Sequence, residues 1–214
     1  MAKILFFGDS ITAFRKNFVV ASELFAEKFP RHQFVNKGVG GNDTNLARAR
    51  FQNDVLDEKP DILVFCFGCN DAAIDVHKQK TEPRLTIEEY LGNLRFFIRE
   101  MRSIGAEMLF WTTPPMVLVE GLKPYYGGEP YTSNGFNFML DRFIAAACQL
   151  MKEEGIEVVD INGVFRQETC GDEEKLVQLI PDGLHPNNEG QKIIFRELCK
   201  KLECFPHFSE SVKE

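Results

Sequence analysis

The sequence has no run of apolar residues that is long enough to cross a bilayer. Only two residues precede the first strand-like run, which leaves no room for the charged, apolar and cleavage regions of a secretory signal peptide. We therefore expect a cytoplasmic protein without stable membrane insertion.

Positive charge is also scarce. The 25 Lys and Arg residues are outnumbered by 32 Asp and Glu residues, and the formal net charge is -7. Because such a chain repels a polyanion, we expect no nucleic-acid partner. Internal repeats are absent, and the length of 214 residues predicts a single domain over residues 1–205 with a polar tail over residues 206–214. Oligomeric state leaves no mark in the sequence.

The six cysteines do not complete the pattern of a metal site. Cys66 and Cys69 have the separation seen in zinc and redox motifs, but no second matching pair completes a tetrahedral site. We interpret the cysteines as small buried apolar residues of a reducing compartment rather than as metal ligands.

What the sequence does contain is a regular alternation of two kinds of segment. Short apolar runs rich in β-forming residues alternate with longer stretches of helical periodicity, which predicts a parallel sheet covered on both faces. We expect an α/β protein, a three-layer α/β/α sandwich on a five-stranded parallel sheet. The predicted strands are residues 4–7, 34–36, 62–67, 108–112 and 156–161, and the predicted helices are residues 18–29, 45–56, 87–104, 136–151 and 187–202.

Polar and glycine-bearing sequence follows three of the predicted strands, where a parallel sheet binds its ligands. The three segments are Gly8-Asp9-Ser10-Ile11-Thr12, Gly38-Val39-Gly40-Gly41-Asn42-Asp43-Thr44 and Gly68-Cys69-Asn70-Asp71. Each segment alone has an ordinary structural explanation as a helix cap or a tight turn. The functional alternative is a serine nucleophile with backbone and amide donors for an oxyanion.

A fourth polar segment, Pro181-Asp182-Gly183-Leu184-His185-Pro186, lies near the C-terminus. Asp182 precedes His185 by three residues, so one turn can bring its carboxylate onto the imidazole and fix the tautomer. Pro186 disfavours a helix at His185, which therefore lies on a loop. A solvent-exposed loop histidine at a helix start remains the alternative.

The four segments together supply a nucleophile, a base, a carboxylate that orients the base, and oxyanion donors. In this order they resemble the sequence blocks of the SGNH (GDSL-like) hydrolases, a family of serine esterases and lipases, over nearly the whole chain. The resemblance implies a flavodoxin-like fold and hydrolysis of esters or thioesters without a metal or organic cofactor. It also implies that Ser10 is the nucleophile, that Asp182 and His185 complete the catalytic triad, and that Ser10, Gly41 and Asn70 form the oxyanion hole. Whether Gly40 or Gly41 supplies its backbone N–H stays open.

Two longer segments leave the same edge of the predicted sheet, residues 72–85 and residues 113–135. Loops of this length are often functional, and aromatic rings on them could line an acyl pocket. We predict that residues 113–135 border the site, and that Asp9, Tyr125 and Tyr131 line the substrate-binding pocket. Packing of the loop onto the domain is an equally good reading of the tyrosines.

We expect a short-chain acyl ester as the substrate, most simply an acetyl ester, because no broad apolar stripe for a long lipid is evident. A lysophospholipase or thioesterase of the same fold is the main alternative. A ligand-binding relative without catalysis, a phosphate or flavin binder at the turn of residues 8–12, and a metal hydrolase using Asp9, Asp71, Asp182 and His185 are others. The sequence lacks the Gly-X-Ser-X-Gly elbow of ordinary α/β-hydrolases.

Overall fold

The computed structural model describes residues 1–209 and contains one parallel sheet of five strands in the order β2-β1-β3-β4-β5. The strands are β1 (Lys3–Gly8), β2 (Gln33–Gly38), β3 (Ile62–Cys66), β4 (Glu107–Trp111) and β5 (Glu157–Val159). The order is that of a doubly wound flavodoxin-like sheet. The predicted fold class is confirmed.

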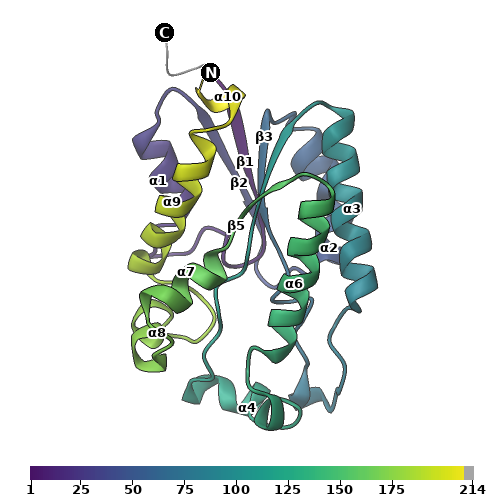
Figure 1. Ribbon diagram of the computed structural model, residues 1–214, viewed down its shortest axis with the longest axis vertical. Helices are drawn as coiled ribbons and strands as arrows, with labels where there is room; N and C mark the ends of the chain where they lie inside the picture. Colours follow the sequence, from purple (N-terminus) through teal and green to yellow (C-terminus); the bar gives the residue numbers. More distant parts are fainter. Residues whose placement is uncertain (210–214) are drawn as a thin grey trace.

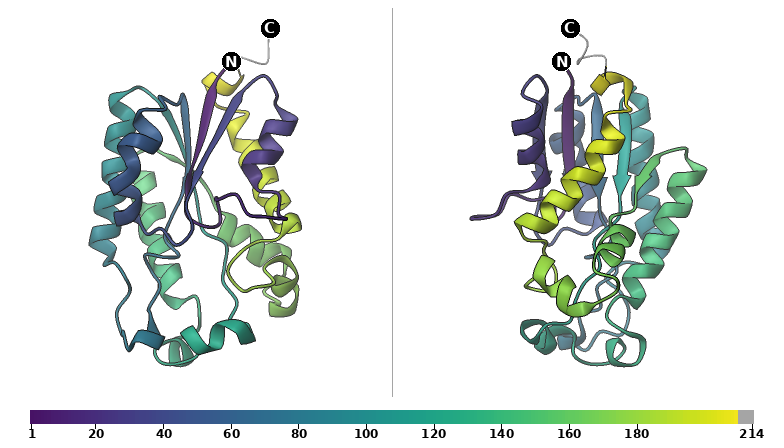
Figure 2. Two further views of the ribbon diagram at one scale, coloured as in Figure 1. Left: turned by 180° about the vertical axis from the view of Figure 1, so that it is seen from behind. Right: turned by 60° about the vertical axis from the view of Figure 1, so that its left-hand side comes forward.

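Helices cover both faces of the sheet, and Figures 1 and 2 show the three layers from different sides. One layer contains α1 (Ala21–Lys28), α7 (Ile161–Glu168), α8 (Glu173–Leu179) and α9 (Asn188–Leu202), and the other contains α2 (Thr44–Phe51), α3 (Ile87–Ser103) and α6 (Phe138–Glu153). Shorter elements are η1 (Gln52–Leu56), η2 (Val76–Lys78), η3 (Glu120–Leu122), α4 (Lys123–Tyr126), α5 (Tyr131–Asn134) and α10 (Pro206–Ser209).

The side chains of each central strand belong alternately to two separate apolar cores, one on each face of the sheet. Phe7 packs under α2 and α3, where its ring forms T-shaped, edge-to-face contacts with the rings of Phe51 and Phe97 at centroid distances of 5.5 and 5.6 Å. The neighbouring Phe6 points to the opposite face and contacts Phe25 of α1. Because successive side chains of a strand alternate between faces, a strand covered on both faces reads as a continuous apolar run. This is why the central strands were recognisable in the sequence.

The structure differs from the predicted elements at element ends and in short segments. The helix predicted from residue 18 begins at Ala21, and the last strand spans only Glu157–Val159 because Asp160 already caps α7 through the N–H of Gly163. Helices α7 and α8 were not predicted. Residues 206–209 of the predicted polar tail form α10, and its Phe208 is fully buried and stacks on His32 at 4.5 Å between ring centroids. Residues 210–214 lie outside the described part of the chain.

The strand order places the ends of β1 and β3 side by side. Gly8, the last residue of β1, is in register with Cys66 at the end of β3. The chain leaves β1 toward one edge of the sheet and later leaves β3 toward the other, which is the switch point where open α/β sheets bind ligands. The segments that carry Ser10 and Asn70 both begin here.

Candidate active site

Ser10 lies on a tight turn that closes directly after β1. The N–H of Ala13 donates to the carbonyl of Asp9 at 3.0 Å, and the N–H of Ile11 donates to the Asp9 carboxylate at 2.9 Å. A Cβ atom added to Gly38 would lie 2.3 Å from the Ala13 nitrogen, so this turn packs directly onto the backbone of β2. Glycine at position 38 is therefore a steric requirement of the turn that presents Ser10.

Ser10, His185 and Asp182 form one chain of hydrogen bonds. The distance between Ser10 Oγ and His185 Nε2 is 2.8 Å, and the distance between His185 Nδ1 and Asp182 Oδ2 is also 2.8 Å. Ser10 and His185 are 175 residues apart in the sequence. The imidazole is thus held between a hydroxyl and a carboxylate, which is the geometry of a nucleophile, a general base and its orienting group.

The loop that carries His185 is fixed from several directions. Gly183 has a φ of +83°, and an added Cβ atom would lie 2.2 Å from the carbonyl oxygen of Val117. The N–H of Val117 donates back to the Gly183 carbonyl at 2.9 Å. On the other side, the Arg15 guanidinium donates to the Pro186 carbonyl at 2.5 Å. These contacts leave the imidazole little freedom to move away from Ser10.

The Asp182 carboxylate stays ionised although it is partly buried. Burial alone would raise its pKa, but hydrogen bonds from the backbone N–H groups of His185 and Leu184 outweigh that effect and hold the pKa below its ordinary value. Both N–H groups donate to Oδ1, at 2.7 and 3.0 Å, so Oδ2 remains available for the ring of His185. An ionised carboxylate at this place favours a positive charge on the imidazole.

The predicted oxyanion donors come from the turns after β2 and β3. A Cβ atom added to Gly40 would lie 3.9 Å from the Ser10 Cβ, so this glycine lies beside the serine, and Gly41 follows with a φ of +73°. Asn70 lines the same pocket as Ser10 and His185. The turn after β2 is held by Asp43, whose carboxylate caps α2 by accepting from the N–H of Leu46 at 2.9 Å.

The structure does not place Asp9 where the sequence suggested. Its side chain is fully buried and does not line the pocket. Its carboxylate accepts from the Cys69 thiol at 3.0 Å and from the Asn70 amide at 3.3 Å, in addition to the N–H of Ile11. Burial raises the pKa of the Asp9 carboxyl against the opposing effect of these donors. Asp9 therefore lies beneath the site as a support, because the turn directs its side chain inward.

A small pocket of about 50 Å³ opens beside Ser10 and His185. Its walls are mainly apolar and come from four loops and turns; besides Ser10, Asn70 and His185 they comprise Ile11, Cys69, Ala73, Met116, Tyr126, Tyr131, Phe136 and Leu184. Tyr131 lines the pocket, and its hydroxyl accepts from the N–H of Ile74 at 2.8 Å. Tyr125 is half-exposed and is not a wall residue; its ring contacts His77, and its neighbour Tyr126 lines the pocket.

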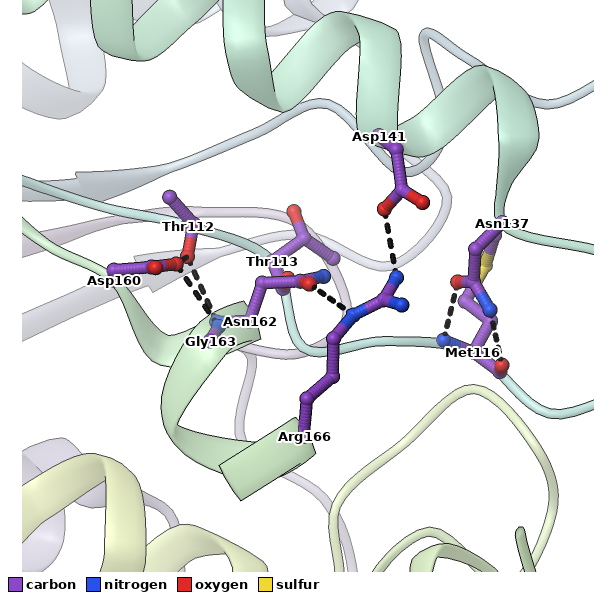
Figure 3. Close-up of polar contacts among 9 residues, drawn as sticks. All are labelled: Thr112, Thr113, Met116, Asn137, Asp141, Asp160, Asn162, Gly163 and Arg166. Atoms are coloured by element: carbon purple, nitrogen blue, oxygen red, sulfur yellow. Dashed lines mark hydrogen bonds and ion pairs between the residues drawn. The ribbon is translucent and has the colours of Figure 1, made fainter. Parts of the chain in front are cut away.

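The long segment after β4 runs down to α4 at the lower end of the molecule in Figure 1. A network of polar side chains fixes the start of this segment. Figure 3 shows the Asn137 side chain binding both backbone groups of Met116, at 2.8 and 2.7 Å. Nearby, the Asn162 amide donates to the Thr113 carbonyl at 2.9 Å and accepts from Arg166 at 2.7 Å. Met116 is thereby held at the pocket wall.

Several wall residues gave no signal in the sequence. Met116 and Phe136 are apolar residues that could equally have been core, and Tyr126 was passed over in favour of Tyr125.

Within residues 1–209, no group of three or more His, Cys, Asp or Glu side chains is arranged to hold a metal ion. None of the helices in the same residues combines the length and the apolar character that a bilayer crossing would need.

Comparison with known proteins agrees with this arrangement. A sequence model of the GDSL-like lipase/acylhydrolase family matches residues 6–193. The chain is 26% identical to an isoamyl acetate-hydrolyzing esterase of Saccharomyces cerevisiae over 95% of its own length and 87% of the relative's. It is 25% identical to an acetylxylan esterase of Geobacillus stearothermophilus over 94% of its own length and 93% of the relative's.

The crystal structure of Axe2, an acetylxylan esterase from the same Geobacillus species, superimposes with a TM-score of 0.73 over 96% of this chain and 95% of that one, at 23% identity. A higher identity, 42%, is found with the uncharacterized lipoprotein YqeF of Bacillus subtilis, but it covers 48% of this chain and only 41% of that protein. The family match, which extends over most of the chain, decides the assignment. This chain belongs to the GDSL-like lipase/acylhydrolase family and is a carboxylic ester hydrolase of the SGNH type.

Proposed function

We propose that this protein is a serine esterase that hydrolyses short acyl esters, in particular acetyl esters, through an acyl-enzyme on Ser10. The observation that carries the proposal is the unbroken hydrogen-bond chain from Ser10 through His185 to Asp182, with 2.8 Å at both links. In the proposed reaction His185 takes the Ser10 proton as the hydroxyl oxygen attacks the ester carbonyl.

The carbonyl oxygen becomes negative in this step and is stabilised by the backbone N–H groups of Ser10 and Gly41 and by the side-chain amide of Asn70. The imidazolium, stabilised by Asp182, then protonates the leaving alcohol. Water activated by His185 cleaves the acyl-enzyme, which returns the proton to Ser10 and releases the acid. No step needs a cofactor.

Two observations favour a small acyl group. The pocket beside Ser10 has a volume of about 50 Å³, and its walls are mainly apolar, which fits a methyl group better than a long chain. The names of two relatives that match nearly the whole chain refer to acetate esters, one of isoamyl alcohol and one of xylan. A long-chain lysophospholipase activity would need a larger acyl site.

The test is hydrolysis of aryl esters of acetate, butyrate and octanoate by the wild type and by Ser10→Ala and His185→Ala. Loss of either group should lower kcat by at least about 10⁴-fold, because the triad acts as a unit. The matched control is Ser103→Ala, an exposed serine at the end of α3, which should keep full activity.

We expect kcat/KM to fall from acetate to octanoate. Equal activity of Ser10→Ala and the wild type would end the serine-esterase proposal. A maximum at octanoate, or a strong preference for the thioester of the same acid, would instead favour the lysophospholipase or thioesterase alternative. If acetate is the best acyl group, acetylated sugars are the next substrates to compare.

A further inference from the structure

The Asn70 side chain is held at both of its polar atoms. Its Oδ1 accepts a hydrogen bond from the Arg84 guanidinium at 3.2 Å. Its Nδ2 lies 3.3 Å from the Asp9 carboxylate and 3.6 Å from the Cys69 sulfur. An amide nitrogen has two hydrogens, so one can serve these inner partners while the other faces the pocket that Ser10 and His185 line.

Arg84 reaches Asn70 because its own loop folds back onto the end of β3. The N–H of Arg84 donates to the carbonyl of Ala73 at 3.0 Å, and the N–H of Leu85 donates to the carbonyl of Asp71 at 3.1 Å. These two bonds attach the far end of the loop after β3 to the residues that directly follow Asn70. The guanidinium is thereby brought to the amide by backbone contacts.

Asp75 fixes the guanidinium in turn. Its two carboxylate oxygens accept from Arg84 Nη2 at 2.8 Å and from Nε at 3.3 Å. The Asp75 side chain is only 12% exposed and that of Arg84 29% exposed, so this pair is better shielded than an ordinary surface ion pair. Hydrogen bonds from Arg84 hold the pKa of the Asp75 carboxyl below its ordinary value.

The other partners of Asn70 do not by themselves decide which way its amide points. A buried carboxyl with a raised pKa, such as that of Asp9, can accept from an amide N–H or, when protonated, donate to an amide oxygen. The Cys69 thiol can also act in either sense. A guanidinium can only donate, so Arg84 is compatible with just one orientation of the amide.

We propose that Arg84, held by Asp75, is a positioning residue that keeps the Asn70 amide turned with Oδ1 away from the pocket and Nδ2 toward the developing oxyanion. This inference rests on the proposed esterase function and assigns a residue that supports its oxyanion hole. The positive charge next to Oδ1 also polarises the amide and makes its N–H a stronger donor. Without Arg84 the amide samples the flipped orientation, in which its oxygen repels the oxyanion.

The experiment compares kcat and KM for an aryl acetate in Arg84→Met, Asn70→Ala and the double variant. Arg84→Met should lower kcat about tenfold with KM within about twofold, a fraction of the roughly hundredfold or greater loss expected for removing the donor itself. In the Asn70→Ala background, Arg84→Met should have no further effect on kcat, because its only route to the reaction has been removed.

Lys78→Met is the matched control. Lys78 also binds the Asp75 carboxylate, at 3.2 Å, but within residues 1–209 it donates no hydrogen bond to Asn70, so its removal should leave kcat unchanged. Asp75→Asn is the second variant, which loosens Arg84 without removing it. It should lower kcat in the same direction as Arg84→Met, and this loss too should vanish in the Asn70→Ala background. Thermal unfolding of each variant identifies any that do not fold.

Three results would overturn the inference: an unchanged kcat in folded Arg84→Met, an equal loss in the presence and absence of the Asn70 amide, or a rise in KM with unchanged kcat, which would indicate direct substrate binding. None of these results touches the proposed function, which is tested separately by Ser10→Ala. If Ser10→Ala were fully active, the esterase proposal itself would fail, whatever Arg84 does.

Discussion

Asp182 and Asp71 lie at the same end of the sheet in opposite environments. The Asp182 side chain is 54% exposed, and backbone donors keep its pKa below the ordinary value. Asp71 is fully buried in the turn after β3, and burial raises its pKa to about 7 against the hydrogen bonds from Thr44. Among the described residues its Oδ2 has no hydrogen-bond partner.

This difference in exposure and pKa shows that the two carboxyl groups have different roles near the site. A group that must stabilise a transient imidazolium has to be ionised at neutral pH. In the solvent-exposed loop of Asp182, backbone N–H donors lower the pKa enough for this. A group that only joins elements need not be ionised. Asp71 accepts from the N–H and hydroxyl of Thr44, at 2.8 and 2.5 Å, and Asn93 of α3 donates to the same hydroxyl at 3.1 Å. Asp71 therefore connects the turn after β3 to the start of α2.

The largest effect that tests this comparison is expected from Asp182→Asn. The amide keeps the size of the side chain but stabilises the wrong tautomer of His185, so kcat should fall by about 10⁴-fold at neutral pH, as in other serine triads. The free energy of unfolding should change far less. Steady-state kinetics with an aryl acetate measures the loss, and the exposed Asp57→Asn serves as the control. A variant with more than a tenth of wild-type kcat would contradict the role given to Asp182.

Asp71→Asn should act mainly on the pH dependence of stability. The folded-state pKa of about 7 lies above the ordinary value of 3.8, so the contribution of Asp71 is fully present below about pH 4 and is lost as the pH rises to about 7. The wild type should therefore lose stability relative to Asp71→Asn over this window, by a few kcal/mol.

Urea unfolding of both proteins at several pH values between 4 and 8 measures the difference. At pH 7, Asp71→Asn should retain far more kcat than Asp182→Asn. A stability difference between wild type and Asp71→Asn that does not change with pH would show that Asp71 is ionised throughout, and the contrast between the two carboxyl groups would disappear.

The smallest effect is expected from Thr44→Val, which removes one of the two donors to Asp71 and keeps the shape of the side chain. The pKa of Asp71 should rise further because a donor that favours the ionised form is lost, and the protein should become less stable by about 1–2 kcal/mol at pH 7. Thr44→Ser keeps the hydroxyl and is the matched control. Equal unfolding curves for the two variants would show that the hydroxyl contributes nothing.

Much of the fold was predictable because the sheet is buried on both faces. β3 is an uninterrupted apolar run whose residues are all buried, and long helices such as α3 and α6 have a clear apolar stripe. The elements that were missed or misplaced are short and marginal. Helices α7 and α8 follow the N-cap residues Asp160 and Asp172, and an aspartate at such a position is equally typical of an ordinary turn. Phe208 was assigned to a polar tail because its partner, His32, is distant in the chain.

For the site, the sequence by itself determined the chemistry: a hydroxyl after the first strand, an amide after the third, and an imidazole with a carboxylate three residues before it. Only the tertiary structure decided which side chains meet. It turned Asp9 inward, put Tyr126 rather than Tyr125 on the pocket wall, and brought Arg84 to Asn70. The physical reason is that residue type is local information, whereas the direction of a side chain depends on how its turn packs against elements far away in the sequence.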